Sequence, residues 1–250
     1  MTSLRKQYAV GWCLDPGADG FSWEWRMSGT VGKTDMLTKA ETTGGELYLV
    51  RHGETAGESS IRFYGATDIP LSDTGRRQMQ LAGEALRGIR FRTAVMSPLS
   101  RSREGAELVL NGSGVRQMVV EDFREIHFGE WEGLTAAEIE ERFPELHRTW
   151  KIEGRLTAFP GGDSREEFFR RVAEAASRVF HNIELPAVAV LHKGVIKGIL
   201  AGLLGGEHAG FTDRPIELGS IQRLKRNGSG WTLAAENETA HLGHLRMEHS

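Results

Sequence analysis

The chain has 250 residues, of which 31 are Lys or Arg and 34 are Asp or Glu, so its net charge is −3. This length fits one large domain or one domain with a tail, and the charge balance argues against a dedicated nucleic-acid-binding protein. The single cysteine, Cys13, excludes an internal disulfide framework and a cysteine-rich zinc site. Apolar stretches such as 185–191 are too short to cross a bilayer, so we expect no membrane span.

The first 45 residues differ in pattern from the rest of the chain. They hold three of the six tryptophans, and their glycines interrupt every candidate element. We expect residues 1–45 to form an irregular or disordered N-terminal extension, and an alternative is that translation starts at Met36. Acidic residues and a brief apolar patch make this segment a poor signal or transit peptide. A cytoplasmic location is therefore the expectation.

From Glu46 onward, strand and helix patterns alternate. We expect a strand at 47–50, a helix at 72–90, a strand at 93–96, a helix at 100–110 and a strand at 115–120. Capping-box sequences at 135–138 and 164–167 each open a helix, the first running to about Phe143. A strand at 187–191, a helix at 195–204 and strands at 220–224 and 231–235 complete the order. This alternation predicts a three-layer α/β/α sandwich with a mostly parallel central sheet.

Residues with complementary chemistry follow four of the predicted strands. Ligands in such sheets bind beyond the carboxyl ends of the strands. Arg51 and His52 follow the first strand, Arg101 lies shortly after the second, Glu125 is in the loop after the third, and His192 follows 187–191. We therefore expect all five side chains on one rim of the sheet.

Each of these residue types has a use in phosphoryl chemistry. Arginine presents a planar fork that fits phosphate oxygens, and a neutral imidazole nitrogen is a nucleophile. Nearby arginines disfavour the imidazolium and keep the ring reactive, while a carboxyl group can protonate a leaving oxygen. Taken singly, each residue has an ordinary structural interpretation. The joint arrangement is what favours a site.

The segment Leu49–Thr55 resembles the signature of the histidine phosphatase superfamily, also called the phosphoglycerate mutase-like family. Further segments resemble motifs of that family in the same order, at 65–72, 97–102, 124–133, 191–196, 219–221 and 237–242. The resemblance covers 46–242, which we expect to be the histidine phosphatase domain, followed by a C-terminal tail at 243–250.

The resemblance implies a role for each candidate. His52 would be the nucleophile that forms phosphohistidine, and Arg51, Arg101 and His192 would hold the phosphoryl oxygens. Glu125 would be the general acid for the leaving group and then the base for the attacking water. Amides near Gly194 would complete the anion pocket. The family uses no metal and no other cofactor for this chemistry, so none is expected.

Several positions depart from the family pattern and bear on the substrate. The candidate substrate-binding residues are Gly53, Thr55, Glu58, Arg62, Tyr64, Lys193 and Gly194. Glu58 stands where the family often has Asn, and its charge would repel a second anionic group of the substrate. Tyr64 stands where Gln is frequent, and Arg62 either reaches the site or lies on the surface. Lys193 stands where a small residue is common, and it is either a solvated lysine or an added contact for an anionic substrate.

The motifs together predict a metal-independent phosphomonoesterase that acts on a small phosphorylated metabolite through phosphohistidine. The spacing between His52 and His192 is short for a mutase of this family, and segment 62–72 is close in style to α-ribazole phosphatases. One alternative is phosphoglycerate mutase-type phosphoryl transfer, and a third is a non-catalytic phospho-ligand-binding protein. We expect no nucleic-acid or membrane partner, and a homodimer stays open.

Overall fold

The structure is a computed structural model, and it describes residues 12–14, 23–25, 45–58, 61–151, 156–205, 215–228 and 230–246. In the N-terminal segment it describes two strands, β1 (Trp12–Leu14) and β2 (Trp23–Trp25), which pair antiparallel. The irregular extension at 1–45 stays a prediction, and Met36 lies outside the described residues.

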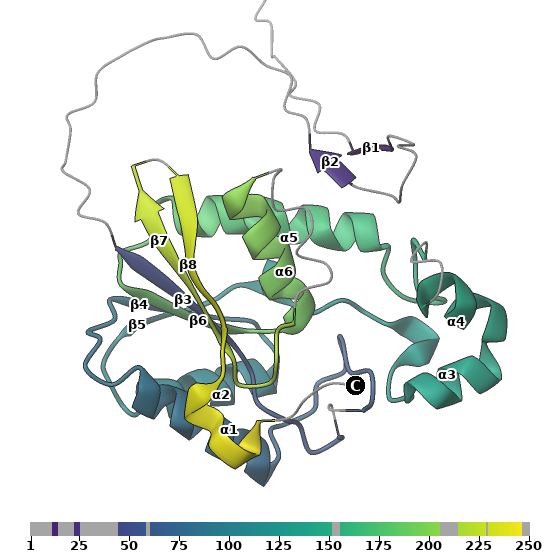
Figure 1. The fold of residues 1–250 in the computed structure, drawn as a ribbon, viewed down its shortest axis with the longest axis horizontal. Coiled ribbons are helices and arrows are strands. Elements are labelled where there is room, and N and C mark those ends of the chain that lie inside the picture. The colour runs from purple at the N-terminus through teal and green to yellow at the C-terminus, as the bar shows by residue number, and fades with distance from the viewer. Residues whose placement is uncertain are drawn as a thin grey trace, which may run out of the picture.

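A six-stranded sheet forms the centre of the molecule, in the order β5-β4-β6-β3-β7-β8 (Figure 1). Neighbouring strands are parallel from β5 through β4 and β6 to β3, whereas β7 and β8 continue the sheet antiparallel. The strands are β3 (Glu46–Arg51), β4 (Thr93–Met96), β5 (Arg116–Val119), β6 (Ala187–Leu191), β7 (Ile221–Asn227) and β8 (Gly230–Glu238). The predicted mostly parallel sheet is confirmed.

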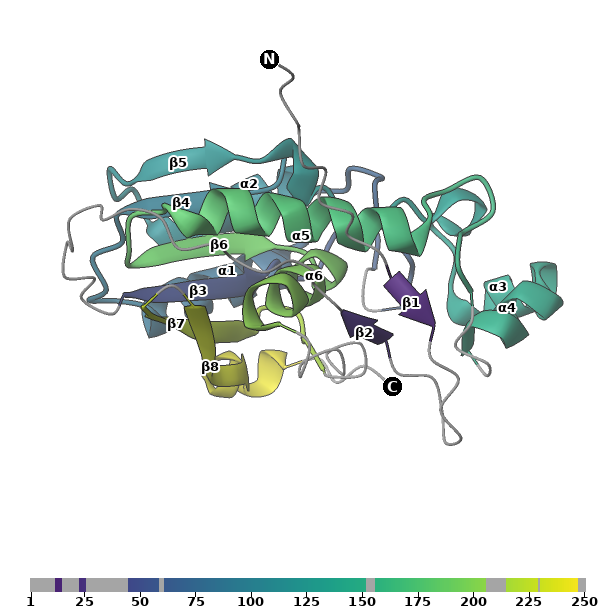
Figure 2. The same ribbon diagram turned by 90° about the horizontal axis from the view of Figure 1, so that it is seen from above.

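Helices cover both faces of this sheet (Figure 2). In β3, Leu47 and Leu49 belong to the core under α5 (Arg165–His181) and α6 (Lys193–Leu204). Tyr48 and Val50 point the other way, into the core with α1 (Asp73–Ala85) and α2 (Ser100–Leu110). Because successive side chains of a strand face opposite sides, the fully buried strand β3 serves two cores at once. The three-layer sandwich predicted from the sequence is therefore confirmed.

A smaller lobe lies to one side of the sandwich, beyond the carboxyl ends of the parallel strands (Figure 1). It contains the helices α3 (Ala136–Arg142) and α4 (Pro144–Lys151). Aromatic rings anchor it: Trp131 packs edge-on against Trp150 and Phe159, with ring centroids 5.6 and 5.4 Å away. Short 3₁₀ helices complete the described elements, namely η1 (Glu121–Phe123), η2 (Gly129–Trp131) and η4 (Ala240–Leu245). Every helix among the described residues is too short or too polar to act as a membrane span.

Two helix boundaries differ from the prediction, and one helix was not predicted. α1 ends at Ala85 rather than at position 90, because Leu86 leaves helical geometry and Gly88 adopts a φ of +95°. α3 stops at Arg142, and α4, which the sequence patterns did not predict, begins at Pro144, where a missing amide costs no helical hydrogen bond. α6 begins two residues early, at Lys193.

The two predicted capping boxes are realised to different degrees. Thr135 accepts a hydrogen bond from the Glu138 amide, and the Glu138 carboxylate accepts one from the Thr135 amide, so this capping box is complete. Ser164 caps α5 by accepting from the Glu167 amide at 3.4 Å. Both helices therefore begin where their sequences predict.

Truncating a core ring should cost the sandwich most of its stability. Phe180 of α5 is fully buried and stacks on Phe123 with ring centroids 5.8 Å apart. We expect Phe180→Ala to lower the free energy of unfolding by about 3–5 kcal/mol in urea titrations. Ile61, which is 57% exposed, is the matched control, and Ile61→Ala should change it by less than about 0.5 kcal/mol. Equal losses in the two variants would contradict this assignment of the core.

Candidate active site

The carboxyl ends of β3 and β6 bring the two histidines together. The two strands pair in parallel register, and the His52 amide donates to the Leu191 carbonyl at 2.9 Å just past the last strand pair. The His52 and His192 rings then meet edge to face, with centroids 5.0 Å apart. The other predicted catalytic residues are buried as well, namely Arg51, Arg101 and Glu125.

His52 is held in one tautomer by its own backbone neighbour. Its Nδ1 lies 2.7 Å from the Gly53 carbonyl oxygen. A carbonyl oxygen only accepts, so Nδ1 must carry the proton and donate it. In the neutral ring, Nε2 then keeps its lone pair. His52 is thus oriented as a nucleophile or a base through Nε2.

The surroundings of His52 also keep its ring neutral. Burial lowers its pKa well below the ordinary value of 6.5, and the positive charges of Arg101 and Arg51 lower it further. The hydrogen bond to Gly53 acts in the opposite direction and is outweighed. A neutral imidazole at pH 7 is the form that can attack phosphorus.

His192 is fixed by a serine that follows β4. Its Nε2 lies 2.6 Å from Ser97 Oγ, and that hydroxyl also accepts from the Leu99 amide. Burial, then Arg101, lowers the pKa of His192 well below 6.5. Its Nδ1 is buried with no hydrogen-bond partner among the described residues. A ligand oxygen is the partner that such a buried atom lacks.

Arg101 is fully buried and is held by backbone carbonyls of one loop. Its Nη1 donates to Thr67 O at 2.8 Å and its Nη2 to Gly65 O at 2.6 Å, while its Nε has no acceptor within the described chain. The Glu132 carboxylate binds the same loop from its other side, accepting from the amides of Gly65 and Ala66. The guanidinium and the carboxylate therefore fix the loop between them.

Arg51 is held by the segment that precedes β7. Its Nη1 donates to the Ile216 carbonyl at 2.7 Å, and the Gly219 amide donates back to the Arg51 carbonyl at 3.1 Å. The Glu217 carboxylate in this segment accepts from Asn237 and from Arg246. Residues 216–219 thus form a loop segment that is bound to the end of β3.

Glu125 reaches the site from the loop after η1. Its Oε2 accepts from the Gly194 amide at 2.8 Å, and its Oε1 accepts from the Ile126 amide at 3.0 Å. Burial raises the pKa of Glu125 and outweighs both amides and the two arginines, which lower it. A carboxyl group with a raised pKa is suited to act as a general acid.

The close approach of α6 to Glu125 requires a glycine. A Cβ at Gly194 would lie 2.5 Å from Glu125 Oε1 and 3.2 Å from the Phe168 ring. The resemblance implied that amides near Gly194 would bind the phosphoryl group. In the structure, the Gly194 amide donates to the Glu125 carboxylate, and an anion pocket formed by the amides near it stays a prediction.

The candidate substrate-binding residues after β3 lie in varied settings. Arg62 donates to Glu138 at 2.9 Å and to the Gly133 carbonyl, and it also pairs with Glu58 at 3.5 Å. The Tyr64 carbonyl faces Arg101 at 3.4 Å. The remaining two lie just past the end of β3. Thr55 is buried and forms an isolated bridge to Leu71, and Gly53 lies against the backbone of Gly75. Lys193, in contrast, is exposed.

Sequence reasoning gave no role to several residues that hold the site. Ser97 and Ser102 lie in the motif at 97–102, and the position of Ser97 directly after β4 was a usable signal. The Ser102 hydroxyl accepts from the Ser97 amide and donates to the Val190 carbonyl. Glu132 and Glu217 carried no such signal, because their partners are brought near only by the folded loops.

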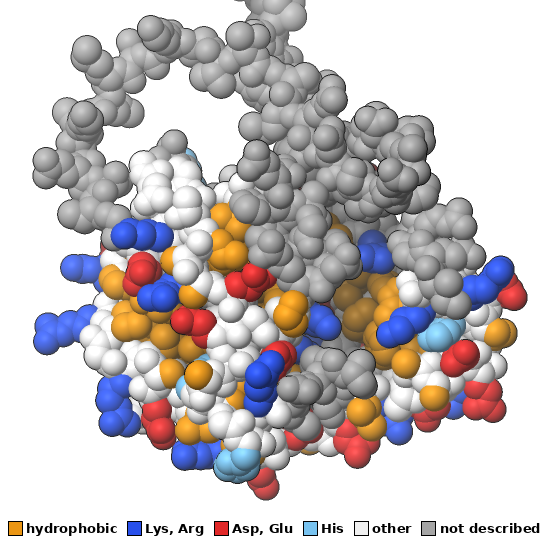
Figure 3. Space-filling model, in the orientation of Figure 1, with side chains coloured by type: hydrophobic (Ala, Val, Ile, Leu, Met, Phe, Trp, Pro, Cys, Tyr) orange, Lys and Arg blue, Asp and Glu red, His pale blue; other side chains and the backbone are white. Residues whose placement is uncertain are grey.

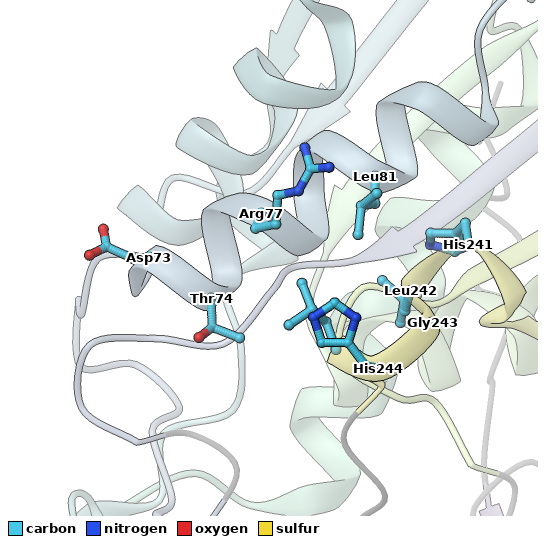
Figure 4. A pocket seen from close by; sticks show the side chains of 9 residues that line it. Asp73, Thr74, Arg77, Leu81, His241, Leu242, Gly243 and His244 are labelled. Atoms are coloured by element: carbon cyan, nitrogen blue, oxygen red, sulfur yellow. The ribbon is translucent and has the colours of Figure 1, made fainter.

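Other features of the described chain lie apart from this site. A groove of about 480 Å³ lies between α1 and η4, lined among others by Arg77, Leu81, His241 and His244 (Figure 4). None of the predicted site residues lines it. No group of three metal-ligating side chains gathers among the described residues.

A sheet covered on both faces, with histidines and arginines at the carboxyl ends of its strands, is the arrangement that the motifs predicted. Residues 47–239 match the histidine phosphatase superfamily (branch 1), and the chain belongs to that family. The resemblance seen in the motifs is thereby confirmed.

Several named proteins are similar to this chain in sequence or in structure. A bifunctional protein of Mycobacterium tuberculosis is 36% identical over 165 residues, which are 65% of this chain and 45% of that protein. The chain therefore spans less than half of that relative. The adenosylcobalamin/alpha-ribazole phosphatase of Salmonella typhimurium is 31% identical over 160 residues, 63% of this chain and 79% of that protein. The structure of the mycobacterial glucosyl-3-phosphoglycerate phosphatase matches with a TM-score of 0.68 at 27% identity, over 78% of this chain and all of that one.

The buried histidines should make the fold sensitive to acid. Their pKa values are lowered from 6.5, so below that pH the unfolded chain binds more protons than the folded one, and the free energy of unfolding falls as pH falls. Each histidine contributes a slope of up to about 1.4 kcal/mol per pH unit. We expect urea titrations between pH 7.5 and 5.5 to show a shallower decline for His52→Gln than for the wild type.

Comparing how the free energy of unfolding changes with pH in the wild type and in His52→Gln isolates the contribution of His52. The raised pKa of Glu125 acts in the opposite sense, because the folded chain then binds the extra proton. This contribution is common to both proteins and does not account for a difference between them. Identical slopes would contradict a neutral, buried His52 in the folded state.

Proposed function

We propose that the chain is a metal-independent phosphomonoesterase of the cytoplasm that hydrolyses a small phosphorylated metabolite through a phosphohistidine at His52. The observation that carries the proposal is the state of His52: its Nδ1 donates to the Gly53 carbonyl, and the buried arginines beside it disfavour the imidazolium. The free Nε2 lone pair therefore lies in a positively charged pocket. Family membership and the phosphatase relatives support this activity.

In the first step, the Nε2 lone pair of His52 attacks phosphorus and the bond from phosphorus to the ester oxygen breaks. Glu125, protonated at the start, gives its proton to the departing oxygen, so an alcohol leaves. Arg51 and Arg101 stabilise the charge on the phosphoryl oxygens. The Gly53 carbonyl keeps the proton on Nδ1 and stabilises the charge that the phosphorylated ring acquires.

In the second step, water attacks the phosphohistidine. The Glu125 carboxylate takes a proton from that water, the bond between Nε2 and phosphorus breaks, and inorganic phosphate leaves. His52 and Glu125 return to their starting states. One carboxyl group therefore serves first as acid and then as base, and its raised pKa favours the protonated form that the first step needs.

The nucleophile is tested by phosphate release in the presence of a chelator. The panel consists of a generic aryl phosphate, 3-phosphoglycerate, sugar phosphates and α-ribazole phosphate. We expect His52→Ala to lower release by about a thousandfold or more, because no other side chain can replace the attacking nitrogen. His181, an exposed histidine at the end of α5, supplies the control, and His181→Ala should retain the wild-type rate.

The outcomes of this assay separate the alternatives. Undiminished release by His52→Ala would overturn the role of His52, and loss of release in chelator would overturn metal independence. Rearranged ester without free phosphate would indicate a mutase. Binding of phosphorylated ligands without turnover of any of them would indicate a phospho-ligand-binding protein.

The general acid is tested by varying the leaving group. Alkyl phosphates need a proton on the departing oxygen far more than 4-nitrophenyl phosphate does, because their alcohols are weaker acids. We expect Glu125→Gln to slow kcat on an alkyl phosphate about a hundredfold and to slow it much less on the nitrophenyl ester. Glu184→Gln, at an exposed position, should leave both rates unchanged. Equal losses on the two esters would show that Glu125 acts only by holding structure.

A further inference from the structure

An exposed lysine stands directly beside the buried site. Lys193 is the first residue of α6, between His192, which caps the helix, and Gly194, whose amide holds Glu125. No carboxylate among the described residues lies within ion-pair distance of it. A cation at a helix N-terminus is electrostatically unfavourable, and the first turn of α6 contains no acidic residue. The local structure therefore gives no reason for a lysine here.

Other cations surround Lys193. Partial burial of its ammonium group, followed by the charges of Arg51, Lys197 and Lys151, lowers its pKa to about 8, and Glu125 opposes them. Lys197 is one turn further along α6, whereas Lys151 ends α4 in the smaller lobe. The positive charge around Lys193 thus comes from the end of β3, from α6 itself and from α4.

Figure 3 shows a recess between the α3–α4 lobe and the body that carries α6, with apolar side chains on its floor and Lys or Arg side chains on both sides. Lys193 directly follows His192, whose ring meets that of His52. The start of α6 therefore lies beside the proposed phosphoryl site.

Glu58, whose charge was expected to repel a second anionic group of the substrate, is partly paired. Glu58 is 65% exposed at its side chain and lies 3.5 Å from Arg62, which also binds Glu138. Arg62 thus partly offsets the charge of Glu58, and solvent screens the rest of that charge over distance. Lys193 has no such carboxylate partner among the described residues.

We propose that Lys193, together with Lys151 at the end of α4, forms a subsite for a second negatively charged group of the substrate. The substrate class is a phosphomonoester that also bears a carboxylate or a second phosphate. This inference rests on the proposed phosphatase function and narrows it. Lys193 is then a specificity residue: it binds the far end of the substrate and takes no part in the bond changes at phosphorus.

Two aryl esters that differ only in a distant charge test the subsite. The esters are 4-carboxyphenyl phosphate and 4-(hydroxymethyl)phenyl phosphate, and the measured quantity is the ratio of their kcat/KM values. We expect the wild type to prefer the carboxylated ester and Lys193→Met to lower that ratio about five- to tenfold, mainly through KM. Lys193→Arg should keep the preference, and raised salt should weaken it in the wild type.

A matched control and a binding measurement make the outcomes decisive. Lys225, exposed on β7, supplies the control, and Lys225→Met should retain the wild-type ratio. An unchanged ratio in Lys193→Met, or equal losses on both esters, would overturn the subsite while leaving the phosphatase intact. Absence of turnover of either ester by the wild type would instead overturn the proposed function. Calorimetry on the same proteins then compares the affinity for 4-carboxybenzyl phosphonate with that for benzyl phosphonate, and this comparison tests the subsite directly.

Discussion

Buried positive charge is the constraint on which the rest of the site depends. Arg101 is fully buried and Arg51 is 7% exposed, and a buried guanidinium is costly unless its donors are satisfied. Backbone carbonyls accept from several of these donors: those of Gly65 and Thr67 for Arg101 and that of Ile216 for Arg51. Two segments that are remote in sequence must therefore meet at the same edge of the sheet.

Carboxylates away from the phosphoryl pocket hold those two segments in place. Glu132 accepts from the amides of the loop whose carbonyls bind Arg101, so opposite charges lie at the two ends of the same peptide dipoles. Glu217 similarly fixes the loop segment 216–219 at the end of β3, where Asn237 and Arg246 donate to its carboxylate. The acidic residues thereby stabilise the arginines, both through these backbone contacts and through their own negative charges.

The parts of this arrangement that follow from strand geometry could be predicted from the sequence. Parallel strands align their carboxyl ends, so the residues directly after them meet, and His52 and His192 do so. The partners of those residues could not be predicted, because Ser97, Glu132 and Glu217 act across loops whose paths depend on the whole fold. Arg62 shows the same limit, since its carboxylate partner belongs to α3. α4 escaped prediction because it begins at a proline next to the end of another helix.

Burial and the nearby arginines together decide the protonation states of His52 and Glu125. The arginines push the pKa values of both groups in the same downward direction. Burial adds to that effect for the imidazole and outweighs it for the carboxyl group, because burial always favours the neutral form. Both groups are therefore biased toward neutrality. In the proposed mechanism, the charge of a phosphoryl dianion would offset the arginines and make the His52 lone pair more basic. An anionic substrate would then strengthen the nucleophile proposed to attack it, and a neutral ligand would not.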